Sequence, residues 1–155
     1  MPRMSECCTI AYIIKPADNE AGVTGDSIHS GKFHSVTYVL QCGALTGDAV
    51  MTVKSGASAG TETTSETFHY RLADADQGSD TADTYASATA ATTLTLTAAT
   101  YDNRTLLVEL DSDEVTDGQP WLTLSLSAAA TAHNSSCIAI CMPRYQGNDP
   151  NTVIA

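Results

Sequence analysis

The sequence has few positively charged residues. Its 155 residues include seven Lys and Arg against eighteen Asp and Glu, so the formal net charge is -11 at pH 7. This charge repels a polyanion at long range, and we therefore expect no nucleic acid partner. The length is close to the commonest size of one domain, so residues 1–155 are predicted to form a single domain around one core.

Long apolar runs are missing too. No stretch reaches the roughly eighteen apolar residues of a membrane-spanning helix, and residues 1–8 lack the apolar core of a signal peptide. We therefore expect a soluble protein, made in the cytoplasm, without a membrane partner. The cysteines are odd in number and no secretion signal precedes them, so we expect reduced, partly buried thiols. They are Cys7, Cys8, Cys42, Cys137 and Cys141.

A sustained helical period is absent, and alternation of apolar and polar residues takes its place. The alternating runs are rich in β-branched and aromatic residues, end at Gly, Asn, Asp or Pro, and predict about eight strands. They are drawn from nine candidate stretches, of which 84–88 and 92–97 are short: residues 8–15, 33–42, 49–54, 66–72, 84–88, 92–97, 104–110, 120–126 and 137–142. Strands at such short intervals, with room for only a short helix at 98–103 or 113–117, predict an all-β fold, an antiparallel β-sandwich or jelly roll.

The segments between the strands are polar. Pro16 is expected to stop the first strand, so that residues 17–31 form an irregular arm or loop. Residues 73–83 are acidic and almost without apolar anchors, which predicts an exposed loop. Residues 1–6 and 144–155 are predicted to be extended terminal arms.

The residue types that bind metals do not gather in the sequence. Cys137 and Cys141 are four residues apart, and on a strand this spacing separates them by about 13 Å, too far to share one ion. The histidines are scattered, and solvent-facing or locally hydrogen-bonded positions explain them best; they are His29, His34, His69 and His133. We predict no metal site and no cofactor site.

A nucleophile with a nearby base is not recognisable either. The pair Cys7 and Cys8 has no histidine close by in sequence, and the acids of residues 74–83 and 111–114 are typical of a solvated surface. Residues 111–117 lack the Gly and the terminal Glu of a calcium-binding EF-hand loop. We therefore predict no catalytic residues and no enzymatic activity.

The aromatic residues admit two interpretations. They would either line a carbohydrate pocket or pack in the core, and their alternation beside Leu and Val favours the core. The residues concerned are Tyr38, Phe68, Tyr70 and Trp121.

Two stretches of the chain resemble a known family. Residues 26–28 (DSI), 33–40 (FHSVTYVL) and 43–48 (GALTGD) follow one another closely, and residues 105–113 (TLLVELDSD) and 143–145 (PRY) come later. This pattern resembles that of small virion proteins encoded beside the major capsid gene of tailed bacteriophages. The resemblance covers residues 26–56 and 104–150, leaves the acidic middle unmatched, and identifies the chain with the cement, or decoration, proteins.

The resemblance implies a structural role. A cement protein of this kind is a β-sandwich or jelly-roll subunit that binds the outside of the assembled, expanded phage capsid and stabilises it by bridging neighbouring major capsid protein subunits. Its partners would be the major capsid protein and further copies of itself, as a homodimer or homotrimer on a capsid symmetry axis. Residues 1–6, 17–32 and 144–155 are the expected contact arms. The alternative is a virion-surface adhesin or head fibre that recognises host glycans.

Overall fold

Two antiparallel sheets enclose one apolar core in the computed structural model, which describes residues 7–144. The first eight elements are β1 (Thr9–Asp18), β2 (Val23–Thr24), β3 (Ile28–His29), η1 (Ser30–Lys32), β4 (Phe33–Leu45), β5 (Ala49–Gly56), β6 (Thr64–Ser65) and β7 (Phe68–Leu72). The others are β8 (Thr89–Ala91), β9 (Thr93–Leu96), α2 (Ala98–Tyr101), β10 (Thr105–Asp111), η2 (Ser112–Glu114), β11 (Trp121–Leu126) and β12 (His133–Pro143). The predicted all-β fold class is confirmed.

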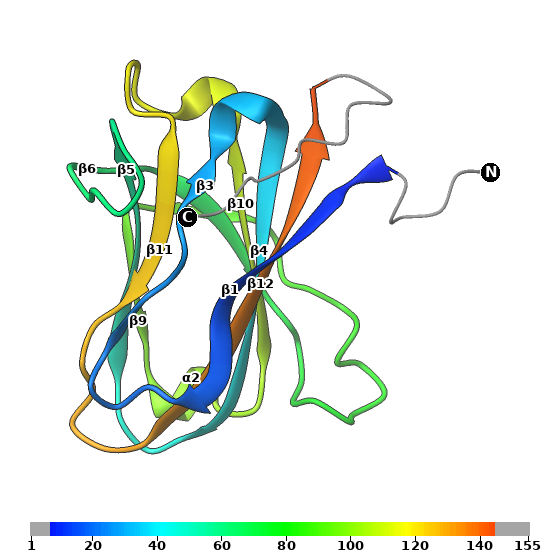
Figure 1. The fold of residues 1–155 in the computed structure, drawn as a ribbon. Coiled ribbons are helices and arrows are strands. Elements are labelled where there is room, and N and C mark those ends of the chain that lie inside the picture. The colour runs from blue at the N-terminus through cyan, green and yellow to red at the C-terminus, as the bar shows by residue number, and fades with distance from the viewer. Residues whose placement is uncertain (1–6, 145–155) are drawn as a thin grey trace.

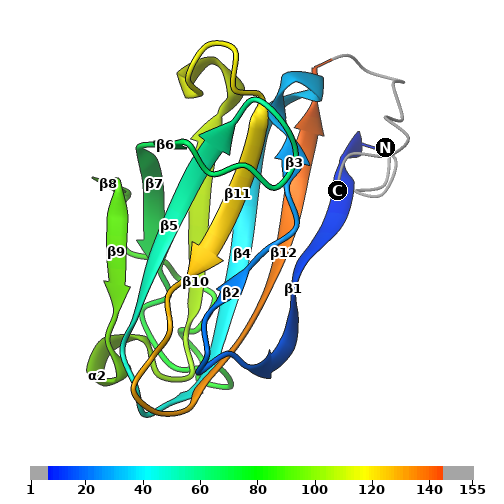
Figure 2. The same ribbon diagram turned by 60° about the vertical axis from the view of Figure 1, so that its left-hand side comes forward.

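The strand order is that of a jelly roll. Sheet A has the order β1-β12-β4-β10-β7-β8, and sheet B has the order β2-β11-β5-β6, with β3 also paired to β11 and β9 to β5. The first strand, β1, therefore pairs with the last, β12, and the next two, β2 and β3, pair with β11. This nested pairing is typical of a jelly roll. In Figure 1 the long strands β4, β11 and β12 run along the body, and in Figure 2 sheet B lies in front of sheet A.

Facing apolar residues of neighbouring strands build the core. On β4, the side chains of Val36, Tyr38 and Leu40 point inward and are fully buried. Tyr38 lies opposite Val108 of β10, which is also fully buried. Burying one such side chain stabilises the fold by about 1.5–3 kcal/mol, so a strand with one apolar and one polar alternate set turns the apolar set inward.

Two expectations for the N-terminal region are wrong. β1 does not stop at Pro16 but runs on to Asp18. Since β1 is an edge strand among the described residues, Pro16 is tolerated without its N–H, and the pairing is irregular between Ile14 and Ala17. Residues 17–31 are not a loose arm either, because β2 and β3 both pair with β11 and Ile28 is fully buried.

The middle of the chain leaves sheet B and returns to it. β6 and β9 pair with opposite ends of β5, so together they fill one strand position, and β7 and β8 between them extend sheet A beyond β10. The strand predicted at 84–88 is wrong, because β8 begins at Thr89 and Tyr85 makes a single bridge with Ala73. The helix expected near 98–103 is present as α2.

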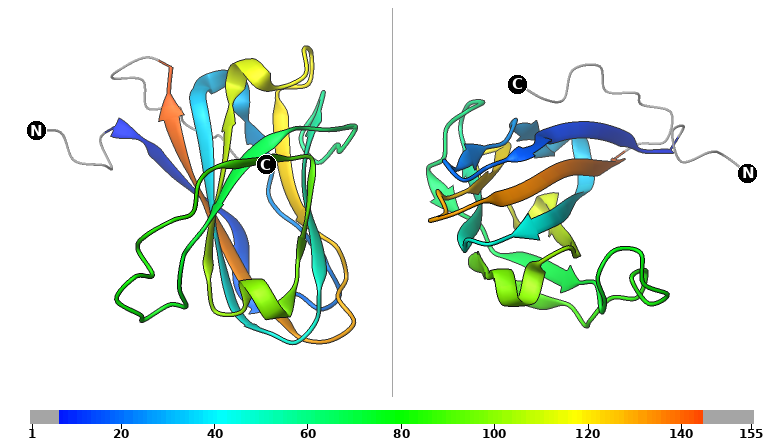
Figure 3. Two further views of the ribbon diagram at one scale, coloured as in Figure 1. Left: turned by 180° about the vertical axis from the view of Figure 1, so that it is seen from behind. Right: turned by 90° about the horizontal axis from the view of Figure 1, so that it is seen from below.

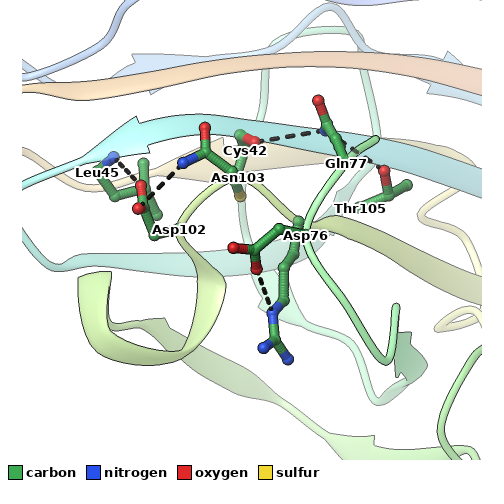
Figure 4. Close-up of polar contacts among 8 residues, drawn as sticks. Cys42, Leu45, Asp76, Gln77, Asp102, Asn103 and Thr105 are labelled. Atoms are coloured by element: carbon green, nitrogen blue, oxygen red, sulfur yellow. Dashed lines mark hydrogen bonds and ion pairs between the residues drawn. The ribbon is translucent and has the colours of Figure 1, made fainter. Parts of the chain in front are cut away.

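Residues 74–83 contain turns and bends and no strand, and the segment protrudes from the body at the lower left of the left panel of Figure 3. Figure 4 shows how it is attached. The Gln77 side chain donates to the carbonyl of Cys42 at 3.4 Å, and Arg104 pairs with the Asp76 carboxylate at 3.2 Å. The acidic segment is therefore anchored at one point to the end of β4 and the start of β10.

The predicted terminal arms, residues 1–6 and 144–155, lie outside the described residues except for Arg144. In residues 7–144 no helix has the length and apolar character needed to span a bilayer.

Candidate functional site

The outward surface of sheet A carries a group of apolar side chains that the core does not use. Among its large apolar side chains, Tyr12 is 66% exposed, Ile10 51% and Met142 46%. The remaining members are half-buried and alternate with core residues on their strands, so they point away from the core. We call the seven residues the apolar face: Ile10, Tyr12, Val39, Leu107, Ile138, Ile140 and Met142.

Strand register assembles the apolar face into rows. Tyr12 lies opposite Ile138, Ile138 lies opposite Val39, and Val39 lies opposite Leu107, which gives one apolar row across four strands. Ile10 lies opposite Ile140 in the next row. Side chains directly opposite each other on antiparallel strands are in contact range, so these rows form a continuous patch.

On β12 the outward side chains of this patch are larger than the inward ones, which is unusual. Its inward residues Cys137, Ala139 and Cys141 are small, whereas its outward residues include the larger Ile138 and Ile140. Burial in the core ordinarily favours the larger apolar side chain, so the outward isoleucines leave apolar area that the core does not cover.

The outward surface of sheet B differs in composition. Thr52, Thr93, Thr95 and Ser125 lie there, together with Lys54, which forms an ion pair with Glu62 at 3.2 Å. Ser125 donates to the Glu62 carboxylate at 2.8 Å, and the exposed Val50 interrupts this polar surface. Of the two broad surfaces of the sandwich, sheet A therefore carries the larger group of outward apolar side chains.

An acidic groove adjoins the apolar face on the same side of sheet A. Its volume is about 310 Å³, and it is lined by Ser35, Thr37, His69, Ala88, Glu109, Leu110, Asp111 and Glu114. Glu109 is within 3.9 Å of Arg71 in an exposed ion pair. The Asp111 and Glu114 side chains form a capping box that holds η2, so two of the carboxylates are fixed by local structure.

The histidines and cysteines do not form a reactive cluster. No three His, Cys, Asp or Glu side chains within residues 7–144 are placed to hold a metal ion. Burial raises the pKa of the Cys42 thiol to about 12, with Asp102 adding to the shift. Burial likewise raises the pKa of the Cys141 thiol to about 12, so both thiols stay protonated and unreactive at neutral pH.

The histidines divide into exposed and buried ones. His34 and His69 are exposed, as the sequence predicted. The prediction is wrong for His133, which is fully buried and has no hydrogen-bond partner at either ring nitrogen among the described residues. Its position at the start of β12, opposite Leu45, explains the difference, because the inward alternation of that strand carries it into the core.

The four aromatic residues Tyr38, Phe68, Tyr70 and Trp121 do not form a shared carbohydrate pocket. Tyr38 and Phe68 are fully buried in the core, as the alternation favoured. Phe68 packs against Tyr70 with ring centroids 6.5 Å apart, whereas Trp121 lies on sheet B with its ring 4.9 Å from that of His29.

Residues 56–60 (GASAG) match the spacing of a nucleophile elbow, a signal that the sequence reasoning missed. The structure places Gly56 at the end of β5 and residues 57–60 in the turn before β6, without the helix that follows such an elbow. Ser58 is exposed there, and its carbonyl accepts from the Thr61 hydroxyl at 2.6 Å. The segment is therefore a turn stabilised by Thr61 and not an active-site elbow.

Comparison with known proteins shows a likeness in fold. No family model and no curated protein matches the sequence. Among solved structures, the SPBc2 prophage-derived protein YomS has a similar fold, with a TM-score of 0.52 and 10% sequence identity over 86% of this chain and 92% of that chain. At this identity the likeness concerns the fold alone.

Proposed function

We propose that this chain is a structural virion protein of a tailed bacteriophage, made in the host cytoplasm and located on the outer surface of the capsid. It acts as a cement protein that binds the expanded shell and bridges neighbouring major capsid protein subunits, without an enzymatic step. Grouping of copies as a homodimer or homotrimer around a capsid symmetry axis is part of this proposal.

The observation that carries the proposal is the apolar face of sheet A. A patch of seven apolar side chains on one broad surface, opposite a surface of threonines and serines, favours binding to another protein over a soluble monomeric role. The jelly-roll fold, which recurs in viral capsid domains, and the fold likeness to a prophage-derived protein agree with it.

The size of the face suits a repeating lattice. Each of the seven positions takes up about 4.8 Å by 6.8 Å on the sheet, which gives an area of roughly 230 Å². A stable pair of isolated proteins usually buries about 800 Å² on each partner, so this face alone would bind weakly. On a shell with many equivalent sites, a protein that binds only the expanded lattice still stabilises it by mass action.

Sedimentation with purified shells tests the proposal. The protein is mixed separately with expanded and with unexpanded shells of the same phage. The shells are pelleted with any bound protein and are then heated. We expect co-sedimentation with expanded shells and a higher temperature of shell disruption. Protein that stays in the supernatant contradicts the proposal, and binding to host cells without any effect on the shell would favour the adhesin alternative.

A further inference from the structure

β1 has two halves that differ in how their outer edge is covered. Within residues 7–144 its strand partner is β12 alone, and in Figure 2 it lies at the right-hand edge of the body. An edge strand leaves about half of its backbone N–H and C=O groups pointing outward, ready to pair with another chain. Natural sheets protect such edges with prolines, bulges or covering segments.

Residues 13–18 of β1 carry all three kinds of protection. The amide of Asp26 donates to the carbonyl of Ile13 at 3.2 Å, and Gly25 packs so closely that a Cβ there would lie 2.7 Å from Cγ2 of Ile13. Pro16 lacks an N–H, and pairing with β12 is irregular on both sides of Ile14. No further strand can therefore add along this half.

Among residues 7–144, none of these features is found at residues 9–12 of β1. They are Thr9, Ile10, Ala11 and Tyr12, and they pair with residues 138–141 of β12 in unbroken register. The segment has no proline, no charge and no bulge, and two of its four side chains are exposed apolar ones. An apolar edge in regular register is of the kind that accepts another strand.

We propose that residues 9–12 of β1 accept an extended segment of the shell protein, which adds to sheet A as a further strand. The inference rests on the proposed function and identifies one of the contacts by which the shell is held. The segment carries apolar side chains at alternate positions, and these continue the apolar face outward beyond Ile10 and Tyr12.

Two observations favour a shell segment over a second copy of this chain. Each copy carries a net charge of -11, so copies free in solution repel each other, and the proposed grouping around a symmetry axis is held by the shell to which the copies bind. The edge is also continuous with the apolar face, so an added strand enlarges that small face on the side where its most exposed residue, Tyr12, lies. An extended segment pairs along four residues without needing the area of a stable dimer.

Paired proline variants test the edge. Along an antiparallel strand, the backbone N–H groups of successive residues point alternately to the neighbouring strand and away from it. One of the two variants Thr9→Pro and Ile10→Pro therefore removes an outward N–H, and the other removes an N–H bonded to β12. The variant that keeps the wild-type unfolding temperature is expected to bind expanded shells about tenfold more weakly, since hydrogen bonds at the edge are lost. Hydrogen exchange of the wild-type amides in residues 9–12 is expected to slow when the protein is on the shells.

The outcomes separate the two proposals. Wild-type protein that does not bind expanded shells overturns both. Wild-type protein that binds while its amides in residues 9–12 exchange as fast as in the free state overturns the edge proposal and leaves the proposed function standing. Slower exchange at these amides in the isolated protein at high concentration, together with dimers in sedimentation velocity, would assign the edge to a second copy. The exchange measurement decides even where neither proline variant folds.

Discussion

Tyr12 and Ile138 lie directly opposite each other on β1 and β12, and both side chains point to the outward surface of sheet A. Tyr12 is 66% exposed, so the intramolecular contact covers only a minor part of its ring. Cross-strand pairs of an aromatic and a β-branched residue stabilise a sheet by about 0.2–1 kcal/mol. The pair therefore contributes little to folding, and most of the apolar area of Tyr12 is left for a partner.

Tyr12→Ala is expected to separate folding from binding. The free energy of unfolding should fall by at most about 1 kcal/mol, because one cross-strand contact is lost. Binding to expanded shells should weaken about tenfold, since aromatic side chains contribute strongly to protein interfaces. Urea denaturation and co-sedimentation give the two quantities. Val50→Ala, which removes an exposed apolar side chain from sheet B, is the control and should leave binding unchanged.

Replacing a buried hydroxyl should stabilise the protein. Tyr38 is fully buried and its hydroxyl has no hydrogen-bond partner among the described residues, while burial raises its pKa well above 10. A buried polar group without a partner costs roughly 1–3 kcal/mol, so Tyr38→Phe should raise the free energy of unfolding by about 1 kcal/mol. Tyr101→Phe is the control, because the Tyr101 hydroxyl is not among the buried groups without a partner, so its loss should not stabilise the protein. A lower stability of Tyr38→Phe in urea denaturation contradicts the prediction.

The buried imidazole of His133 should make stability fall in mild acid. Burial lowers its pKa below the usual 6.5, and the carboxylates of Asp18 and Asp48 offset the shift only in part. As the pH falls through 6.5 toward the lowered pKa, the unfolded chain takes up a proton that the folded protein does not, so the free energy of unfolding decreases; above 6.5 this contribution is fully present.

Thermal unfolding measured between pH 5 and 8 checks this prediction, with His133→Leu as the comparison. The wild-type protein should lose more stability in acid than the variant, which has no titrating group at this position. Equal pH dependence of the two proteins would show that His133 does not contribute.

Alternation predicted the long strands because their signal is local. The predicted strand 104–110 is shifted by one residue from β10, and the predicted strand 120–126 begins one residue before β11 and ends with it. β2 and β3 were missed because each has two residues and exists only by pairing with β11, about a hundred positions later in the chain. Tertiary pairing of this kind leaves no periodic pattern to find.

The sequence did not predict the apolar face, for a related reason. Residues 137–142 read as a nearly continuous apolar run, which predicts a strand but not which alternate set turns inward. Packing decides that Cys137 and Ala139 are inside while Ile138 is outside. The row of Tyr12, Ile138 and Val39 further requires the register of three separated segments, which one sequence does not supply.

Two aspartates near the acidic segment should differ in their effect on stability. The Asp102 carboxylate accepts the backbone N–H of Leu45 at 2.7 Å and the Asn103 amide at 3.1 Å, and so ties the end of α2 to the end of β4 (Figure 4). Asp76 pairs at 3.2 Å with Arg104 but is itself 64% exposed. Exposed ion pairs contribute about 0–1 kcal/mol, whereas hydrogen bonds to a charged group contribute about 1.5–3 kcal/mol.

Asp102→Ala is therefore expected to lower the free energy of unfolding by about 2 kcal/mol, and Asp76→Ala by less than about 1 kcal/mol. Urea denaturation of the two variants measures both values, and repeating it in 1 M salt should reduce the effect of Asp76→Ala further because salt screens exposed charges. The Leu45 amide is at the end of β4 and donates to Asp102. Its rate of hydrogen exchange with solvent should therefore rise in Asp102→Ala and stay unchanged in Asp76→Ala. If the two variants lost equal stability, the carboxylate of Asp102 would not be what holds α2 against β4, and the backbone bonds of residues 97–104 would have to do so alone.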